Sequence, residues 1–137
     1  MKIEYKINEV VSVDEFIDVL ERSGLSERRP VHDRVCMAGM LENCDLLVTA
    51  RVDGLLVGVS RSLTDFHYAC YLSDLAVDKR FQGKGVGIEL QRRTQNELGP
   101  HCKLILIAAP KANNYYPKIG YTNRPNCWVV SKDQKIG

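Results

Sequence analysis

The sequence predicts a mixed α/β domain of the α+β class, in which an antiparallel N-terminal meander precedes a strand–glycine loop–helix–strand unit. Two observations indicate this class. Three β-rich runs follow one another with short turns between them, as is typical of a meander. A polar, glycine-rich stretch then leads from the third run into a helical pattern, and a short continuous apolar run follows that helix.

An edge strand and a helix are predicted first. Residues 2–8 alternate between polar and apolar side chains, which indicates a strand. Ser12 and Glu15 have the spacing of a capping box, and Gly24 is a natural helix stop. We therefore expect the first helix to begin after Ser12 and to end at Gly24.

A second helix is expected to begin at Pro30, which is favoured in a first helical turn, and to end near Asn43. Its predicted buried stripe consists of Val31, Val35, Ala38 and Leu41. The two arginines just before it, Arg28 and Arg29, are interpreted as a solvated charge run.

The meander is predicted from three β-rich runs over 46–52, 55–61 and 68–77. Asp53 and Gly54 join the first two runs and are a strong signal for a type I′ hairpin, because both central residues of that turn need positive φ. The remaining predicted elements are a helix over 88–98 with Val86, Leu90, Thr94 and Leu98 on one stripe, a strand over 103–108 buried on both faces, a short helix over 112–118 ending at Gly120, and strands at Tyr121 and 127–131.

Composition places the chain among ordinary globular proteins. Its 137 residues fit one domain over 1–137, and a net charge of +2 does not favour nucleic acid or a membrane surface as a partner. The sequence has no apolar run near the roughly 20 residues of a membrane span, and no signal peptide. Five widely spaced cysteines without a CxxC pair argue against disulfides and a metal site, and favour a cytoplasmic location.

The richest segment is the stretch between the third run and the helix, where glycines alternate at Gly83, Gly85 and Gly87. Glycine lets the backbone turn tightly and approach a ligand closely. The first N–H groups of the following helix attract an anion such as a diphosphate, and Arg80 and Lys84 add positive charge.

Two well-known phosphate-binding motifs do not fit this loop. A Walker A loop needs Ser or Thr after its Gly-Lys pair, whereas Gly85 follows Lys84 here. In the dinucleotide fingerprint GxGxxG the last glycine would fall on Ile88 or Leu90. The pattern [QR]-x-x-G-x-[GA] is met by residues 80–85.

With the preceding strand residues Leu75, Ala76 and Val77, this loop resembles the acyl-CoA-binding motif of the GNAT superfamily of N-acetyltransferases. Residues 112–121, Ala-Asn-Asn-Tyr-Tyr-Pro-Lys-Ile-Gly-Tyr, resemble a second hallmark of that family, A-x-x-[FY]-Y-x-K-x-G-[FY]. The resemblance covers 46–121 in element order and implies a GNAT-like mixed sheet.

The resemblance implies direct transfer of an acetyl group from acetyl-CoA to an amine, without a metal. It assigns cofactor binding to Leu75, Ala76, Val77, Gln82, Gly83, Lys84, Gly85, Val86, Gly87 and Asn113. A backbone N–H near Leu75 or Ala76 would stabilise the oxyanion. Tyr116 would protonate the leaving thiolate, with Tyr115 pointing elsewhere.

The amine must lose a proton, and Asp74 is the nearest candidate base; Ser73 and Tyr71 could instead relay the proton through water. Pro117 departs from the family pattern and is expected to end the short helix early, because it disfavours helical geometry at Tyr116. Asn113 is expected to replace a pantetheine-contacting Asn that is Ala109 here.

The sequence gives little information about which amine accepts the acetyl group. The basic residues Arg28, Arg29, His32 and Arg61 suit an acceptor with a carboxylate, such as an amino acid or peptide, whereas Asp65 and Asp74 suit a polyamine or aminoglycoside. An alternative is a catalytically idle acyl-CoA-binding regulatory module, in which the loop is kept without turnover. Family members often form homodimers, but no residue here identifies an interface.

Overall fold

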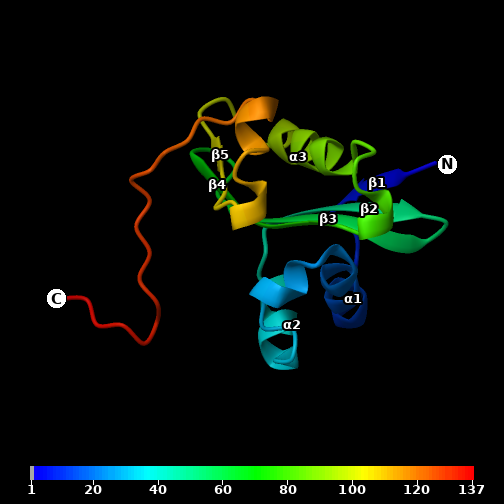
Figure 1. Cartoon of the computed structure of the whole chain (residues 1–137), viewed down its shortest axis with the longest axis horizontal. Coiled ribbons are helices and arrows are strands. Elements are labelled where there is room, and N and C mark those ends of the chain that lie inside the picture. Colours follow the sequence, from blue (N-terminus) through cyan, green and yellow to red (C-terminus); the bar gives the residue numbers. More distant parts are fainter. Residues whose placement is uncertain (1) are drawn as a thin grey trace. The chain divides into compact units, whose positions relative to one another are not determined.

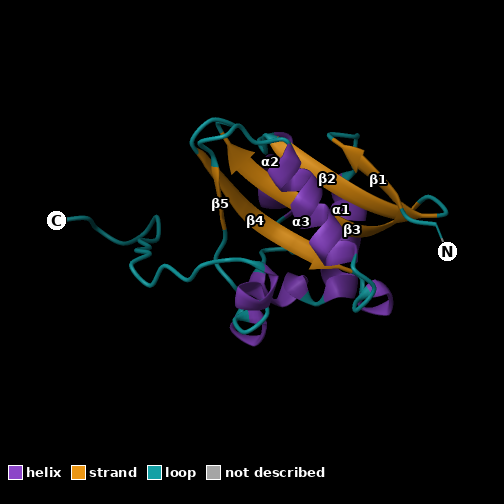
Figure 2. Cartoon of the chain, turned by 90° about the horizontal axis from the view of Figure 1, so that it is seen from above, coloured by secondary structure: helices purple, strands orange, loops and turns teal. Residues whose placement is uncertain are grey.

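The computed structural model describes residues 2–137, which form two compact units, a first that runs to Ile107 and a second over Ala108–Gly137. The first unit contains a five-stranded mixed sheet with the order β1-β2-β3-β4-β5 (Figure 2). Its strands are β1 (Glu4–Ile7), β2 (Leu46–Val52), β3 (Leu55–Thr64), β4 (Ala69–Val77) and β5 (Lys103–Ile105). Strands β1 to β4 are antiparallel and β5 is parallel to β4, which confirms the predicted fold class.

Helices cover both faces of this sheet. Helices α1 (Val13–Ser23) and α2 (Arg34–Glu42) lie on one side, and α3 (Val86–Asn96) lies on the other (Figure 1). Each face has its own apolar cluster: Phe16, Val19 and Leu20 of α1 are fully buried on one, and Val86 and Leu90 of α3 on the other. None of the helices within residues 2–137 has both the length and the apolar character needed to cross a bilayer.

The local signals in the first half are confirmed. Ser12 and Glu15 form the predicted capping box, and Gly24 ends α1 with a φ of 88°. Asp53 and Gly54 have φ values of 49° and 83°, as the hairpin between β2 and β3 requires.

The predicted start of the second helix is wrong, and its predicted buried stripe is wrong at Val35, whereas Val31 and Leu41 pack against the core. Helix α2 begins at Arg34, because the Asp33 side chain accepts a hydrogen bond from the Cys36 N–H and so caps the helix there. Pro30 lies in the preceding turns. Met37 is the fully buried residue of α2, whereas Val35 is 84% exposed.

Predictions for the last strand of the sheet also need correction. Strand β5 has three residues, and Ile105 and Ile107 are 46% and 55% exposed, so this run is not buried on both faces. The residues of β5 alternate between exposed and half-buried, which is the pattern of a strand covered on one face only. Helix α3 begins at Val86, two residues earlier than expected, and its buried stripe of Val86, Leu90 and Thr94 is confirmed.

The second unit contains two short 3-10 helices, η3 (Pro110–Ala112) and η4 (Tyr116–Ile119), and Gly120 ends η4 with a φ of 108°. No strand occurs in residues 108–137, so the strands predicted at Tyr121 and 127–131 are wrong. A strand requires a hydrogen-bonded neighbour, which the β-rich composition of 127–131 cannot supply by itself. The expected effect of Pro117 is wrong too, because proline is tolerated in a first turn, where its missing N–H is not needed.

Candidate active site

Along more than half of its length, strand β4 has no neighbouring strand on one of its two edges. Strands β4 and β5 pair only from Ala69 to Tyr71, so within the described chain the rest of β4 meets no strand on that side. The Asp78 N–H donates to the Val57 carbonyl at 2.8 Å, so alternate residues of β4 turn their main chain toward β3. By this alternation Ala76 faces β3, and the main-chain groups of Leu75 and Val77 face the open edge.

The glycine-rich loop begins where β4 ends. Gly83 and Gly85 have φ values of 74° and 83°, a conformation that other residues rarely adopt. A Cβ atom added at either glycine would meet no atom within 4 Å. Backbone conformation therefore explains these two glycines, and the space that a side chain would occupy at each of them is open.

Helix α3 begins at this loop with an N-terminus that no side chain caps. Gly85 is the N-cap residue, and the first intrahelical bond runs from the Glu89 N–H to the Gly85 carbonyl at 3.0 Å. The N–H groups of Val86 and Gly87 precede that bond, and the helix dipole makes this end electropositive. Such an end fits a phosphate or diphosphate group.

An aspartate anchors the loop to the rest of the unit. Asp78 caps the 3-10 turn η2 (Lys79–Phe81) and accepts two bonds at 2.8 Å from Arg80, one from its N–H and one from its Nη2. Arg22 of α1 also donates to Asp78 and, at 2.6 Å, to the Leu56 carbonyl. Hydrogen bonds from Arg80 hold the pKa of Asp78 well below its usual range, against the opposing effect of burial. The charge of Arg80 is thus paired with Asp78, and Lys84 is exposed on the loop.

Asp74 lies within a buried cluster of charges. Its side chain is fully buried, and it accepts hydrogen bonds from Arg29 Nε at 2.5 Å and from Arg61 Nε. The β3–β4 register shifts here, so Ser73 is an extra residue in β4. Arg61 donates to Ser73 Oγ at 3.0 Å and Arg29 donates to the Ser73 carbonyl at 2.7 Å. The interpretation of Arg29 as a solvated charge is therefore wrong, because a buried carboxylate holds it.

This arrangement limits what Asp74 can do. Each of its oxygens already accepts from a guanidinium group, so taking a proton from an amine would weaken at least one of these ion pairs. Ser73 is engaged through both its hydroxyl and its carbonyl. Tyr71 is 36% exposed. Of the three residues predicted to remove the proton, Tyr71 is thus the most accessible to water.

Tyr116 and Asn113 belong to the second unit, whereas the other predicted site residues belong to the first. The Tyr116 ring packs edge-on against Tyr115 and Tyr121, with centroids 5.1 and 5.3 Å away. Tyr115 was expected to point away from Tyr116, but the two rings are in contact. Burial, with a smaller effect of Tyr115, raises the pKa of Tyr116 above its ordinary value. Asn113 is exposed at the end of η3.

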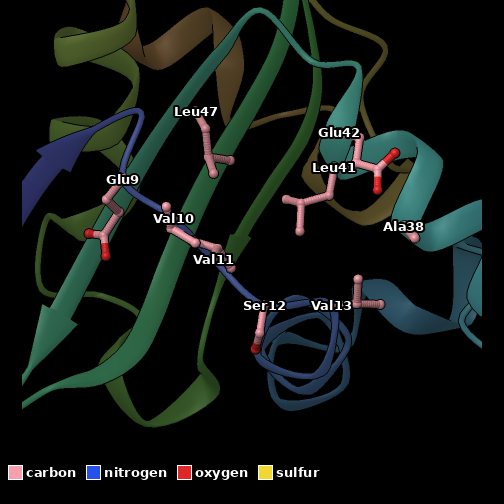
Figure 3. A pocket seen from close by; sticks show the side chains of 9 residues that line it. All are labelled: Glu9, Val10, Val11, Ser12, Val13, Ala38, Leu41, Glu42 and Leu47. Atoms are coloured by element: carbon pink, nitrogen blue, oxygen red, sulfur yellow. The ribbon is translucent and has the colours of Figure 1, made fainter.

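A pocket of about 350 Å³ lies elsewhere in the first unit, between the segment before α1 and helix α2 (Figure 3). None of the predicted site residues lines it. Its lining consists of Glu9, Val10, Val11, Ser12, Val13, Ala38, Leu41, Glu42 and Leu47.

Sequence reasoning missed Arg22 and the contacts that Arg29 and Arg61 make. The pair of Asp78 and Arg80 could have been predicted, because the two residues are two positions apart in a capped turn. No local signal links Arg29 to Asp74, which is 45 residues further along the chain.

Solved structures share this fold over nearly the whole chain. A protein of unknown function from meticillin-resistant Staphylococcus aureus has a TM-score of 0.77 at 19% identity, with 95% of this chain and 98% of that one covered. A ribosomal-protein-alanine N-acetyltransferase from Brucella melitensis biovar Abortus has a TM-score of 0.72 at 19% identity, with coverage of 95% and 99%. An aminoglycoside acetyltransferase from an uncultured soil metagenomic sample, solved with sisomicin, has a TM-score of 0.66 at 17% identity, with coverage of 97% for both chains.

Identities this low show the fold alone, and no curated protein gives a significant match. The family comparison is more specific. The model of the acetyltransferase (GNAT) domain matches residues 17–127, which include the open edge of β4, the glycine-rich loop and Tyr116. The chain therefore belongs to the GNAT acetyltransferase family, whose members are enzymes that use acyl-CoA as cosubstrate.

Proposed function

We propose that this protein transfers the acetyl group of acetyl-CoA to a primary amine by direct attack of the amine on the thioester carbonyl. One observation carries the proposal. The open edge of β4 leads, within one strand and one turn, into an uncovered glycine-rich loop and an uncapped helix N-terminus. An extended chain that ends in a diphosphate is complementary to such a sequence of sites.

The residues of the loop and the open edge would bind acetyl-CoA in two parts. Backbone N–H groups of the loop and first helical turn would hold the diphosphate, with contributions from Gln82, Gly83, Lys84, Gly85, Val86 and Gly87. Pantetheine would pair with Leu75 and Val77 like an added strand. The Gln82 side chain donates to the Val77 carbonyl at 2.9 Å. We expect this bond to give way when the ligand pairs with Val77.

Negative charge develops on the carbonyl oxygen as the amine attacks. A main-chain N–H that faces the open edge is suited to stabilise it, since it is already oriented and partly shielded from water. The alternation in β4 favours Leu75 over Ala76 as this donor, because the main chain of Ala76 faces β3.

Two proton transfers complete the reaction. We propose that Tyr116 gives a proton to the thiolate of CoA, since a tyrosine phenol is protonated at neutral pH and can donate to a thiolate that is held close to it. The amine would lose its proton to water beside Tyr71. Asp74 would act as a positioning residue, because both of its oxygens are held by arginines.

The expected setting is the cytoplasm. The five cysteines, Cys36, Cys44, Cys70, Cys102 and Cys127, are all free thiols, which is typical of proteins kept in a reducing compartment.

Thermal unfolding with and without acetyl-CoA tests the cofactor. A ligand at 100 times its dissociation constant adds about 2.7 kcal/mol to the free energy of unfolding, so a clear rise in melting temperature is expected. NAD and ATP serve as controls. A Gly85→Glu variant that remains folded should lose the shift, because the carboxylate repels a diphosphate and the residue is strained at this positive φ. Absence of a shift in the unaltered protein would remove the basis of the proposal.

Turnover separates an enzyme from an idle acyl-CoA-binding module. Acetylation of a panel of amines should be detectable with the unaltered protein and should fall strongly with Tyr116→Phe. Acetyl-CoA binding should persist in that variant. An unchanged rate in Tyr116→Phe at several pH values would exclude this tyrosine as the acid.

A further inference from the structure

We propose that the acceptor is a free α-amino acid with an apolar side chain, and that Arg29 binds its carboxylate. This inference rests on the proposed acetyl transfer and names the substrate of that same site. The observations that carry it are the buried cluster of Arg29, Arg61 and Asp74 and the apolar residues that lie beside it on the sheet.

The cluster holds one more positive charge than negative. Arg29 and Arg61 are both paired with Asp74, and neither has an ion pair with another carboxylate among the described residues. Two guanidinium groups and one carboxylate leave a net charge of +1 in a largely buried place. A buried charge is costly unless it is balanced, so a second carboxylate is the ligand group that this cluster favours.

Arg29 is the member of the cluster that can receive a ligand. Its side chain is 21% exposed, whereas that of Arg61 is 5% exposed and that of Asp74 is fully buried. Arg29 donates Nε to Asp74, Nη2 to the Ser73 carbonyl at 2.7 Å and Nη1 to the Arg28 carbonyl at 2.8 Å. A guanidinium has five N–H groups, so one N–H on each terminal nitrogen of Arg29 is left for a further acceptor.

The position of Arg29 matches the reach of an amino acid. It is bonded to the carbonyl of Ser73, which lies two residues before Leu75, the proposed oxyanion donor. Two residues of a strand span about 7 Å. An amine attacking near Leu75 and a carboxylate attached to the same carbon can therefore approach the two groups together.

Apolar residues lie beside the arginines on the same face of the sheet. Leu63 is two residues from Arg61 on β3, so both side chains point to one face. Tyr71 pairs with Leu63 across β3 and β4, and Ile105 pairs with Tyr71 across β4 and β5. All three side chains are at least a third exposed. This row offers a surface for an apolar or aromatic side chain, whereas a polycationic acceptor would be repelled by the arginines.

Matched pairs of amines test the proposal directly. L-phenylalanine and phenethylamine differ only in the carboxylate, as do L-leucine and 3-methylbutylamine. We expect kcat/KM to be at least about 10-fold higher for each amino acid, as one charge-assisted hydrogen-bonded contact allows. Arg29→Gln should lower kcat/KM for the amino acids, mainly through KM, by about 10- to 100-fold more than it lowers kcat/KM for the plain amines.

Arg92→Gln is the matched control, because it removes the same charge from an exposed position on α3, on the opposite face of the sheet. The melting shift with acetyl-CoA checks that each variant is folded. If Arg29→Gln does not fold, Arg29→Lys replaces it; this variant keeps the charge but not the fork of donors, and an intermediate loss is expected. Binding of L-phenylalanine to the protein saturated with CoA, measured by calorimetry, gives a second readout.

The outcomes separate the two proposals. A protein that shows no acetyl-CoA shift and no turnover of any amine would overturn the proposed acetyl transfer, and this inference with it. An equal kcat/KM for phenethylamine and phenylalanine would overturn the carboxylate site alone. An Arg29→Gln variant in which kcat/KM falls by the same factor for both amines would do the same.

Discussion

Two buried aspartates of the β4 region are each held by two arginines, and the clusters differ mainly in how far the second arginine is exposed. Asp74 lies inside β4, and its partners Arg29 and Arg61 come from distant parts of the chain and are 21% and 5% exposed. Arg61 also donates to the Met40 carbonyl of α2, so this cluster joins β3 and β4 to the helix that covers them.

Asp78, which directly follows β4, is held more openly. Arg80 is only two residues away and its side chain is 64% exposed, while Arg22 reaches Asp78 from α1. The first cluster therefore creates a buried excess of positive charge, and the second attaches the glycine-rich loop to the folded unit. The same pairing of residue types gives a candidate recognition site in one place and an anchor in the other.

Removing the enclosed carboxylate should have the largest effect. Asp74→Asn leaves two mostly buried guanidinium groups without a counter-charge, and breaking a buried pair in this way costs about 3–5 kcal/mol. Urea unfolding should show this loss in the free energy of unfolding. Asp53→Asn is a suitable control, because it removes a carboxylate at a hairpin position where Asn tolerates positive φ. A loss below about 1 kcal/mol would mean that water reaches the cluster and that Asp74 is not enclosed.

Removing the anchor carboxylate should have a smaller effect. Asp78→Asn loses the charged hydrogen bonds from Arg22 and Arg80, which is worth about 1.5–3 kcal/mol, and Arg80 can be solvated afterwards. Acetyl-CoA affinity should fall as well, because the loop loses its tie to α1. Equal destabilisation by Asp74→Asn and Asp78→Asn in urea unfolding would contradict the difference drawn between the two clusters.

Acid should weaken the anchor in the unaltered protein. The pKa of Asp78 lies below its ordinary value of 3.8 in the folded state, so its stabilising contribution is complete above that value and declines as the pH falls toward the folded pKa. The difference in free energy of unfolding between the unaltered protein and Asp78→Asn should therefore shrink below about pH 4, by at most about 1.4 kcal/mol per pH unit. Urea titrations from pH 6 to pH 2 measure this, and a constant difference would exclude the linkage.

The predictions that succeeded depended on local physical chemistry. The Ser12–Glu15 capping box and the Asp53–Gly54 hairpin each follow from a few adjacent residues. The glycine-rich loop was found for the same reason, since its signal lies within one turn between a strand and a helix.

The predictions that failed depended on distant partners. Residues 127–131 have strand-forming side chains, but a strand also needs a neighbour, and no strand occurs in that unit. Arg29 looked solvated because Asp74, which holds it, lies 45 residues away. The composition of the Lys103–Ile105 region predicted burial on both faces, yet only one face of this strand is covered.

The smallest change in stability is expected for Arg80→Gln, because Arg80 is largely exposed and Arg22 continues to hold Asp78. The melting temperature at neutral pH should change much less than in Asp78→Asn. Hydrogen bonding from Arg80 is the largest cause of the low pKa of Asp78. By linkage, the free energy that Arg80 adds at neutral pH is the part of the acid loss that should disappear in Arg80→Gln. Loss of stability should then begin and end within a narrower pH range below 4. The double variant Arg80→Gln, Asp78→Asn isolates this effect: if Arg80→Gln alters the acid response equally with and without Asp78, the two residues are not coupled, and the anchor depends on Arg22 alone.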